Sequence, residues 1–315
     1  MIRRLRHRSS IRRHRPGFHS RFGGLWTDRI DAKEELARRL AAGTVDAEQE
    51  PLLRGWIERG YTVLKGAVDP DLCDAMRAHV EELWRTVDRD VLVELGSERH
   101  PMDPSLRPLH YKLLDLHAAD GPARQALFAR PISEYLTLLF EREPLLFQSL
   151  TFETGSTQPV HQDTAYVVTT RPMELAAAWI ALEDIEPGTG ELVYYPASHR
   201  FPEHVFGGGA RNWNRRRDGD DEHRRYLDGL HEKADAMGLQ LEAFCPRKGD
   251  VLLWSADLAH GGGAITREGS TRWSLVGHFC PADVEPYYFA YRAKQRKLAR
   301  AYEHGWVSSS YYPVT

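Results

Sequence analysis

The chain has 315 residues, 42% of them hydrophobic, and a formal net charge of −3 at pH 7, which suits a globular protein with a substantial core. No apolar stretch approaches the roughly 18 to 20 residues needed to cross a bilayer, and the first residues lack a secretory signal, so we expect no membrane association. Three widely separated cysteines without a CxxC pair exclude a disulfide framework and a thiolate zinc site, and they favour a reducing cytoplasm.

The beginning of the chain differs in charge from the rest. Residues 1–22 contain eight arginines and no acidic residue, so the remaining body is acidic. An arginine run of this kind can contact nucleic acid or anionic lipid, but the simpler interpretation is a solvated, disordered extension. We favour the extension and expect no nucleic-acid partner. Residues 23–315 are predicted to form a single domain.

Residues 31–140 have the pattern of a helical layer. Short helices are expected from Asp31 and from Asp46, because each segment begins with a capping-type residue and ends at glycine. A strand over 61–68 follows. The next segment starts at Asp69 with an Asp-Pro pair and places apolar side chains at helical spacing, which predicts a longer helix.

From about residue 145 the sequence changes to short alternating or β-branched segments separated by turn residues. Examples are "EPLLFQSLTFETG", "HQDTAYVVTT", "ELVYYPASHR" and "GDVLLWSADLAHGGG". Regular short strands with glycine and proline turns predict a β-sandwich or jelly roll over about 145–281. The whole chain is therefore expected to be an α+β protein with a β core flanked by helices.

Two further segments belong to neither pattern. Residues 201–247 are rich in charge and glycine and then become helical, which predicts either disordered surface or a functional lid; Trp213 and Tyr226 favour a lid. Residues 287–304 have an aromatic and aliphatic face and are expected to form a C-terminal helix. That helix would pack on the core or on a second subunit, so we expect a monomer or a homodimer.

One short segment carries a pair of metal-ligating side chains. His161 and Asp163 are two positions apart, so on a strand both would point to the same face. A lone HxD pair is weak evidence, because the two side chains can simply hydrogen-bond at a strand end. His260 strengthens it, since this residue follows an apolar strand and precedes a glycine run. Two imidazoles and one carboxylate leave the opposite positions of a metal open, as in non-haem Fe(II) oxygenases.

Beyond His260, Arg272 and Ser274 alternate onto one face of the strand "TRWSLVGHF". A barrel interior does not bury an unpaired guanidinium, so Arg272 predicts a carboxylate that arrives with a ligand, with the Ser274 hydroxyl assisting. A salt bridge within the chain is the alternative explanation, and Arg267 competes for the role of clamp. A metal triad beside a carboxylate clamp suggests a chelating keto acid.

These motifs resemble the phytanoyl-CoA dioxygenase family of Fe(II)- and 2-oxoglutarate-dependent oxygenases. The matching stretches are "HQDTAY", "WIALEDIEPGTGELVYYPASHR" and "KGDVLLWSADLAHGGGAITREGSTRWSL", in family order. The resemblance implies a double-stranded β-helix, a jelly-roll or cupin-like core. It also implies Fe(II) as cofactor with 2-oxoglutarate and O₂ as cosubstrates. The iron ligands would be His161, Asp163 and His260, and Arg272 would hold the distal carboxylate of 2-oxoglutarate.

The resemblance assigns further roles around this site. Trp179 occupies the place of a tryptophan that lines the cosubstrate pocket, and Ser274 matches a serine that accompanies the arginine. Gln148 and Thr151 are candidates for contacts in the same pocket. Halogenating relatives carry alanine or glycine where this chain has Asp163, which argues against halogenation.

The function implied is hydroxylation of an unactivated C–H bond in a small organic metabolite, with 2-oxoglutarate converted to succinate and CO₂. A cupin-type metalloenzyme without 2-oxoglutarate, acting as an isomerase or cleavage enzyme, and a non-catalytic binding relative remain as alternatives. Among the other histidines, His199 and His278 show no comparable partner pattern. Tyr166 is expected either to face substrate or to fill the barrel.

Overall fold

The computed structural model describes residues 17–290 and 300–315, and its core consists of two β-sheets. The larger sheet has the strand order β1-β9-β6-β11-β5-β4-β2-β3, and the smaller sheet has the order β10-β7-β8. The strands are β1 (Tyr61–Leu64), β2 (Leu92–Leu95), β3 (Glu98–Pro101), β4 (Lys112–Leu114), β5 (Pro144–Phe152), β6 (Ala176–Ala181), β7 (Leu192–Tyr194), β8 (Glu242–Phe244), β9 (Val251–Ser255), β10 (His260–Gly262), β11 (Ser274–Pro281), β12 (Arg300–Tyr302) and β13 (Gly305–Val307).

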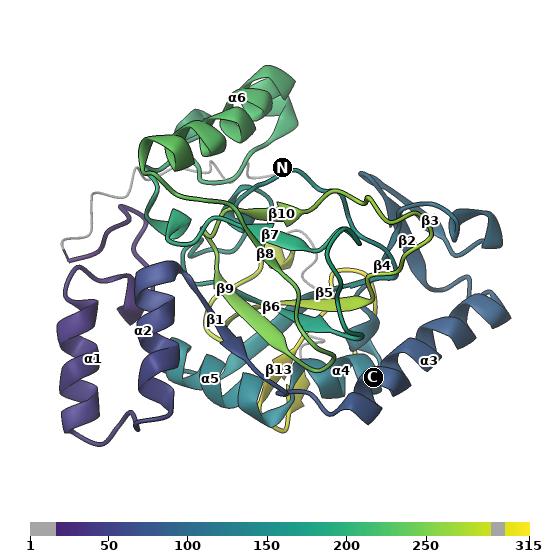
Figure 1. Cartoon of the computed structure of the whole chain (residues 1–315), viewed down its shortest axis with the longest axis horizontal. Helices are drawn as coiled ribbons and strands as arrows, with labels where there is room; N and C mark the ends of the chain where they lie inside the picture. Colours follow the sequence, from purple (N-terminus) through teal and green to yellow (C-terminus); the bar gives the residue numbers. More distant parts are fainter. Residues whose placement is uncertain (1–16, 291–299) are drawn as a thin grey trace, which may run out of the picture.

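Helices surround these sheets, as predicted for an α+β jelly roll. They are α1 (Ala32–Ala41), α2 (Gln49–Arg59), α3 (Pro70–Thr86), α4 (Pro122–Leu127), α5 (Arg130–Phe140) and α6 (Arg215–Ala236). Figure 1 shows α1 and α2 at one edge of the strands, α3, α4 and α5 along one side, and α6 on the opposite side near β10 and β7. Within the two described segments, no helix combines the length and the apolar character that crossing a bilayer requires.

The central strands β6, β9 and β11 of the larger sheet are buried on both faces, and β6 illustrates the reason. Ala178 and Ile180 belong to the apolar cluster that also contains helix residues such as Trp56, whereas Ala177 and Trp179 belong to the cluster between the sheets. A strand covered on both faces reads as a continuous apolar run rather than as an alternation. Packing on both faces fixes the position of such a strand, and with it the side chains that point toward the space between the two sheets.

The predicted N-terminal helices are confirmed. α1 begins one residue after Asp31, α2 ends before Gly60, and the Asp69 side chain accepts a hydrogen bond from the backbone N–H of Asp71 at the start of α3. The helical layer contains three strands that the sequence did not predict, because β2, β3 and β4 extend the larger sheet beyond the predicted core. The strand expected over 61–68 is present but shorter, since β1 covers Tyr61–Leu64. Short strands of this kind are hard to identify in a sequence because their pairing partners are distant.

Three predictions are wrong in part. They concern the N-terminal tail, the segment after His161 and the C-terminal helix. Residues 17–22 of the predicted tail are packed rather than extended, since Phe18 forms a β-bridge with Arg29; residues 1–16 lie outside the described part. The segment "HQDTAYVVTT" is not a strand, because Asp163–Ala165 forms a 3-10 turn. The Asp163 carbonyl closes this turn by accepting hydrogen bonds from the backbone N–H groups of Tyr166 and Val167.

The expected C-terminal helix over 287–304 is absent at both of its described ends. Tyr287–Ala290 forms a 3-10 turn, Arg300–Tyr302 is a strand, and residues 291–299 lie outside the described residues. β12 pairs with β13, which adds to β5 in parallel, with Trp306 opposite Leu145. Pairing with the core sheet outweighs the local helical pattern here.

The insertion over 201–247 contains a longer helix than its sequence predicts. α6 begins inside the charge-rich stretch, because Asn214 caps it by accepting hydrogen bonds from the backbone N–H groups of Arg216 and Arg217. Gly219 interrupts the helix with a φ of 75°, a left-handed conformation that favours glycine. The insertion returns to the core through β8, an edge strand of the smaller sheet.

Candidate metal centre and cosubstrate pocket

The two predicted histidine ligands are brought together by backbone pairing between a loop and a strand. The His161 N–H donates to the His260 carbonyl over 2.8 Å, and the His260 N–H donates back over 2.9 Å. Close approach of the two segments requires glycine after His260, since a Cβ at Gly261 would lie 2.8 Å from the Gln158 carbonyl oxygen. The glycine run predicted to allow such an approach therefore holds the two imidazoles side by side.

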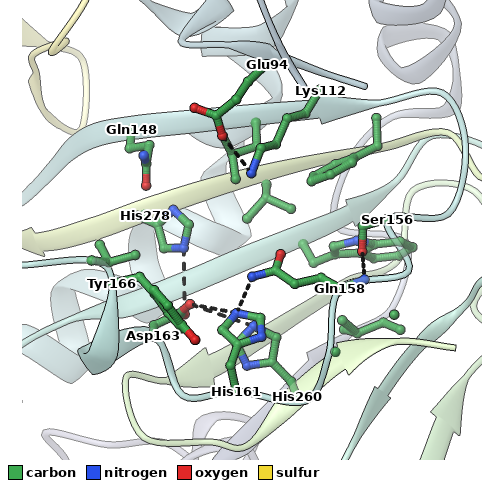
Figure 2. A pocket seen from close by; sticks show the side chains of 18 of the residues that line it. Glu94, Lys112, Gln148, Ser156, Gln158, His161, Asp163, Tyr166, His260 and His278 are labelled. Carbon is green, nitrogen blue, oxygen red and sulfur yellow. Dashed lines mark hydrogen bonds and ion pairs between the residues drawn. The ribbon is translucent and has the colours of Figure 1, made fainter. Parts of the chain in front are cut away.

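Asp163 completes a compact and buried triad. Its Oδ1 atom lies 3.8 Å from Nε2 of His161 and 3.7 Å from Nε2 of His260. One ligand atom from each residue can be chosen so that all three lie within 4.8 Å of one another. Figure 2 shows the three side chains converging at the base of the pocket. The 3-10 turn, rather than strand alternation, turns Asp163 toward the histidines.

Hydrogen bonds orient both imidazoles for metal binding. Nδ1 of His161 donates to the Pro159 carbonyl over 2.8 Å, and Nδ1 of His260 donates to the Leu258 carbonyl over 2.9 Å. This arrangement leaves both Nε2 atoms with their lone pairs toward Asp163. Burial, together with the neighbouring His260, lowers the pKa of His161 to about 3, so this imidazole is neutral at physiological pH, as a metal ligand must be.

The second oxygen of Asp163 is held by two residues that the sequence did not single out as site residues. Trp254 Nε1 donates to Oδ2 over 2.8 Å, and His278 Nε2 lies 3.6 Å from the same atom. Burial alone would raise the pKa of Asp163, but His260 and His278 outweigh it and hold this pKa well below its ordinary value. Asp163 is therefore a fixed, ionised carboxylate with Oδ1 directed at the histidines. This donor set fits Fe(II).

Arg272 lies buried in the wall of the cavity that contains the triad, a hollow of about 530 Å³. The side chain is 2% exposed, and Nη1 donates to Ser274 Oγ over 3.1 Å. The guanidinium lies 5.5 Å from the centre of the Trp179 ring and 5.3 Å from that of Phe152. Burial lowers the pKa of Arg272 to about 10, so it remains charged at neutral pH.

No carboxylate within residues 17–290 and 300–315 forms an ion pair with Arg272, and its buried Nε atom has no hydrogen-bond partner there. A buried cation without a counter-ion is costly unless a ligand supplies the negative charge. The predicted alternative, a salt bridge within the chain, is therefore not what the described residues contain. A dicarboxylate such as 2-oxoglutarate fits this site.

The sequence profile of the phytanoyl-CoA dioxygenase (PhyH) family matches residues 56–272, which include the triad and Arg272. The chain belongs to this family. It is thus a non-haem iron oxygenase that uses 2-oxoglutarate, and His161, Asp163 and His260 are suited to hold the iron. Among curated proteins, no significant sequence match was found.

Solved structures share the fold. The α-ketoglutarate-dependent carbocyclase SnoK from nogalamycin biosynthesis is 19% identical, with 80% of this chain and 92% of SnoK covered and a TM-score of 0.57. The epimerase SnoN from the same biosynthesis is 17% identical over 75% of this chain and 84% of SnoN, with a TM-score of 0.56. EctD from S. alaskensis, solved with 2-oxoglutarate and 5-hydroxyectoine, is 19% identical over 75% of this chain and 76% of EctD, with a TM-score of 0.54.

Of the remaining residues predicted for this PhyH-family site, two line the cavity and two lie outside it. Trp179 and Gln148 line the cavity. Thr151 does not, because the alternation along β5 directs Gln148 into the cavity and Thr151 to the opposite face, where it is buried. Arg267, the competitor for the clamp, lies outside the cavity with its side chain 55% exposed and 3.7 Å from Glu186.

Several cavity residues had no recognisable signal in the sequence. His278 lies on the same face of β11 as Ser274, so its position could have been inferred by counting in twos from the predicted clamp. The others require the three-dimensional structure, because they come from distant strands and loops. They are Glu94, Arg99, Lys112, Gln158 and Trp254. Tyr166 and Trp213, which the sequence named as candidates for substrate contact and for a lid, also line the cavity.

Proposed function

We propose that this PhyH-family enzyme hydroxylates an unactivated C–H bond of a small organic metabolite. The observation that carries the proposal is the complete triad beside the buried Arg272, which forms no ion pair within residues 17–290 and 300–315. Asp163 fills the position that halogenating relatives leave to chloride, so oxygen transfer is favoured. SnoK and SnoN, which share the fold, are a carbocyclase and an epimerase, and the reaction outcome is therefore the part that needs a direct test.

Within this proposal, bound iron would activate O₂ as the oxidant, and 2-oxoglutarate would be converted to succinate and CO₂. The chain supplies positions and charge. Arg272 and Ser274 hold the distal carboxylate of 2-oxoglutarate, with Trp179 as one wall of its pocket. Trp254 and His278 keep one oxygen of Asp163 occupied, so that the other is presented to the metal.

The insertion over 201–247 acts as the lid in this proposal. Trp213 lines the cavity and stacks on His223 of α6 with ring centres 4.2 Å apart, and His223 hydrogen-bonds the Tyr166 hydroxyl over 2.6 Å. These rings form the outer wall next to His161. A wall of this kind excludes water and retains substrate while the oxidant is present.

The proposed primary substrate is a small molecule of the cytoplasm, because three widely separated cysteines without a CxxC pair favour a reducing compartment. A metabolite pool is first screened for succinate release by the iron-loaded enzyme. The substrate found in this screen is then converted under ¹⁸O₂, and the mass of its product is measured by mass spectrometry. Hydroxylation adds one labelled oxygen atom.

The other outcomes are distinct in the same measurement. Ring closure removes two hydrogen atoms without adding oxygen, and epimerisation leaves the mass unchanged; either result would refute hydroxylation. The His260→Ala variant, which loses a metal ligand, is the control for background oxidation. An anaerobic Fe(II) titration tests the cosubstrate itself, because the visible charge-transfer band of the chelate requires both metal and keto acid.

A further inference from the structure

Three charged side chains form a row on the cavity wall opposite the iron ligands. Glu94 of β2 is the direct cross-strand neighbour of Arg99 on β3 and of Lys112 on β4. Its Oε1 atom lies 2.9 Å from Lys112 Nζ, and its Oε2 atom lies 3.0 Å from Arg99 Nε. All three residues line the cavity that contains the triad, and Figure 2 shows Glu94 and Lys112 across that cavity from His161.

This charged row has one positive charge in excess. Glu94 is a single carboxylate shared between two cations, and within the described part of the chain neither cation forms an ion pair with another carboxylate. The iron and 2-oxoglutarate site does not require this extra positive charge for its own charge balance. When iron and 2-oxoglutarate are bound, the positive charges of the metal and Arg272 balance those of Asp163 and the dicarboxylate. The charged row therefore carries the unmatched charge of the loaded cavity.

The donors of the charged row are accessible from the cavity. The exposed fractions of the Glu94, Lys112 and Arg99 side chains are 14%, 22% and 44%, so the row is partly buried. The Lys112 ammonium has three N–H groups, and Glu94 occupies one of them. Arg99 contacts Glu94 through Nε, and no hydrogen bond from its Nη atoms is found within the described residues, so these donors remain for a ligand. Gln148 points into the same cavity with an amide (Figure 2).

Two members of the charged row, Glu94 and Lys112, also line a second hollow next to the cavity. This second hollow of about 480 Å³ shares Glu94, Lys112 and Tyr166 with the first, and His110 and His223 also line it. A substrate with its reacting carbon near the triad can therefore reach the row with its other end. A charge held there would orient the molecule without contacting the reacting atoms.

We propose that Lys112 and Arg99 bind an anionic group, a carboxylate or a phosphate, at the non-reacting end of the primary substrate. The proposal rests on the proposed function for the identity of the reacting end. Glu94 has a tuning role, because it holds the two cations in place and lowers their net charge. A row that served only to stabilise the β2–β3 hairpin would need no place in the cavity and no excess charge.

Sulfate and inorganic phosphate are the probes for the test, titrated calorimetrically into the anaerobic enzyme loaded with Fe(II) and saturating 2-oxoglutarate. Wild type is expected to bind them, and Lys112→Met and Arg99→Gln should each weaken binding at least about tenfold, the cost of one charge-assisted contact. Glu94→Gln should strengthen binding, because the cations lose their competing carboxylate. These opposite signs separate a ligand site from a structural ion-pair row, whose loss would act in one direction.

Lys248→Met is the matched control, since Lys248 pairs with Asp74 over 2.9 Å at another place on the protein. Absence of binding to wild type, or equal binding by all variants, would overturn the proposal. Iron and 2-oxoglutarate affinities measured in the same samples show whether the proposed function fails with it. Once anion binding is found, succinate release with carboxylic acids, with phosphate esters and with their neutral analogues identifies which anion the substrate carries.

Discussion

Asp163 illustrates how single residues set the chemistry of the site. One carboxylate oxygen faces the two imidazoles, and the other is occupied by Trp254 and His278. Each histidine ligand is fixed in the same manner, through a hydrogen bond from the ring nitrogen that faces away from the metal position. Residues that orient the ligands in this way tune metal affinity as well as position.

The hydrogen bond from Trp254 to Asp163 is expected to support iron binding. Trp254→Phe keeps an aromatic side chain but removes the N–H donor, so iron affinity should fall about 10- to 100-fold. An anaerobic Fe(II) titration in the presence of 2-oxoglutarate measures the change. Trp306→Phe is the matched control, because Trp306 Nε1 donates to the Glu143 carboxylate over 2.8 Å away from the site. Equal iron affinity of both variants would contradict this role.

Arg272 is expected to bind 2-oxoglutarate rather than to take part in the chemical step. Arg272→Gln removes the charge that meets the distal carboxylate, so the KM for 2-oxoglutarate should rise at least about tenfold. Steady-state succinate release measures this KM. Arg267→Gln, a change at the exposed arginine on the same loop, should leave it unchanged. If Arg267→Gln raised the KM instead, the assignment of the clamp would be reversed.

At the scale of elements, the insertion is docked directly on the loop that carries the metal ligands. The Tyr226 hydroxyl accepts from the Gln162 N–H over 3.0 Å, and the Trp213 N–H donates to the Ala165 carbonyl over 3.0 Å. Arg211 forms a buried ion pair with Asp257, 2.5 Å away. Removing one partner of a buried pair costs about 3–5 kcal/mol. Deleting 207–222 would therefore destabilise the fold as well as open the cavity.

Trp213→Ala is consequently the sharper test of the lid, because it opens the outer wall and leaves the buried ion pair intact. We expect more succinate to be released per product formed, since water reaches the oxidant and substrate is held less firmly. Chromatographic measurement of both products gives the ratio. Arg215→Ala, at an exposed position of the same insertion, is the control and should keep the wild-type ratio. A wild-type ratio in Trp213→Ala as well would show that the insertion is not a lid.

At the scale of the whole molecule, buried polar groups join segments that are distant in the sequence. The Asp115 carboxylate accepts hydrogen bonds from the backbone N–H of Ser149 and from the Ser309 hydroxyl, which ties the C-terminal segment to β5. Near the other end, Asp28 accepts from the Leu25 N–H over 2.9 Å. The Asp115 contacts hold the C-terminal segment against the sheet that carries the site, whereas the Asp28 contact closes a local 3-10 turn.

Asp28 makes the stability of the molecule depend on pH. Burial is the main cause that raises its pKa to about 6, so the folded state favours the protonated carboxyl more than the unfolded state does. This stabilisation is complete below the unfolded pKa of about 4 and is lost as the pH rises through about 6, a change on the order of 3 kcal/mol. Urea unfolding between pH 4 and pH 7 measures it.

Asp28→Asn should flatten this pH dependence, because the amide is neutral throughout the range and its oxygen can still accept from Leu25. Asp228→Asn, a change at an exposed carboxylate, should leave the wild-type dependence in place. A variant at Asp28 that kept the full decline from pH 4 to pH 7 would show that another group is responsible.

Local patterns in the sequence were sufficient for the fold class, and they predicted the residues of the metal and keto-acid site. Alternation and turn residues indicated the jelly roll, and the pairing of His161 with Asp163, the glycine run after His260 and the arginine at 272 indicated an iron and keto-acid site. These signals are readable because each lies within a few consecutive residues. Prediction failed where strand pairing overrode local propensity, as at 300–302, and where a turn replaced a strand, as at Asp163.

What only the tertiary structure decided is everything that depends on register between distant strands. The contact of Trp254 and His278 with Asp163, and the row formed by Arg99, Glu94 and Lys112, arise because antiparallel pairing places particular residues opposite one another. A shift by one residue would turn each of these side chains to the other face. Sequence alone thus determined which chemistry the chain can support, and the packing of its strands decided which side chains surround that chemistry.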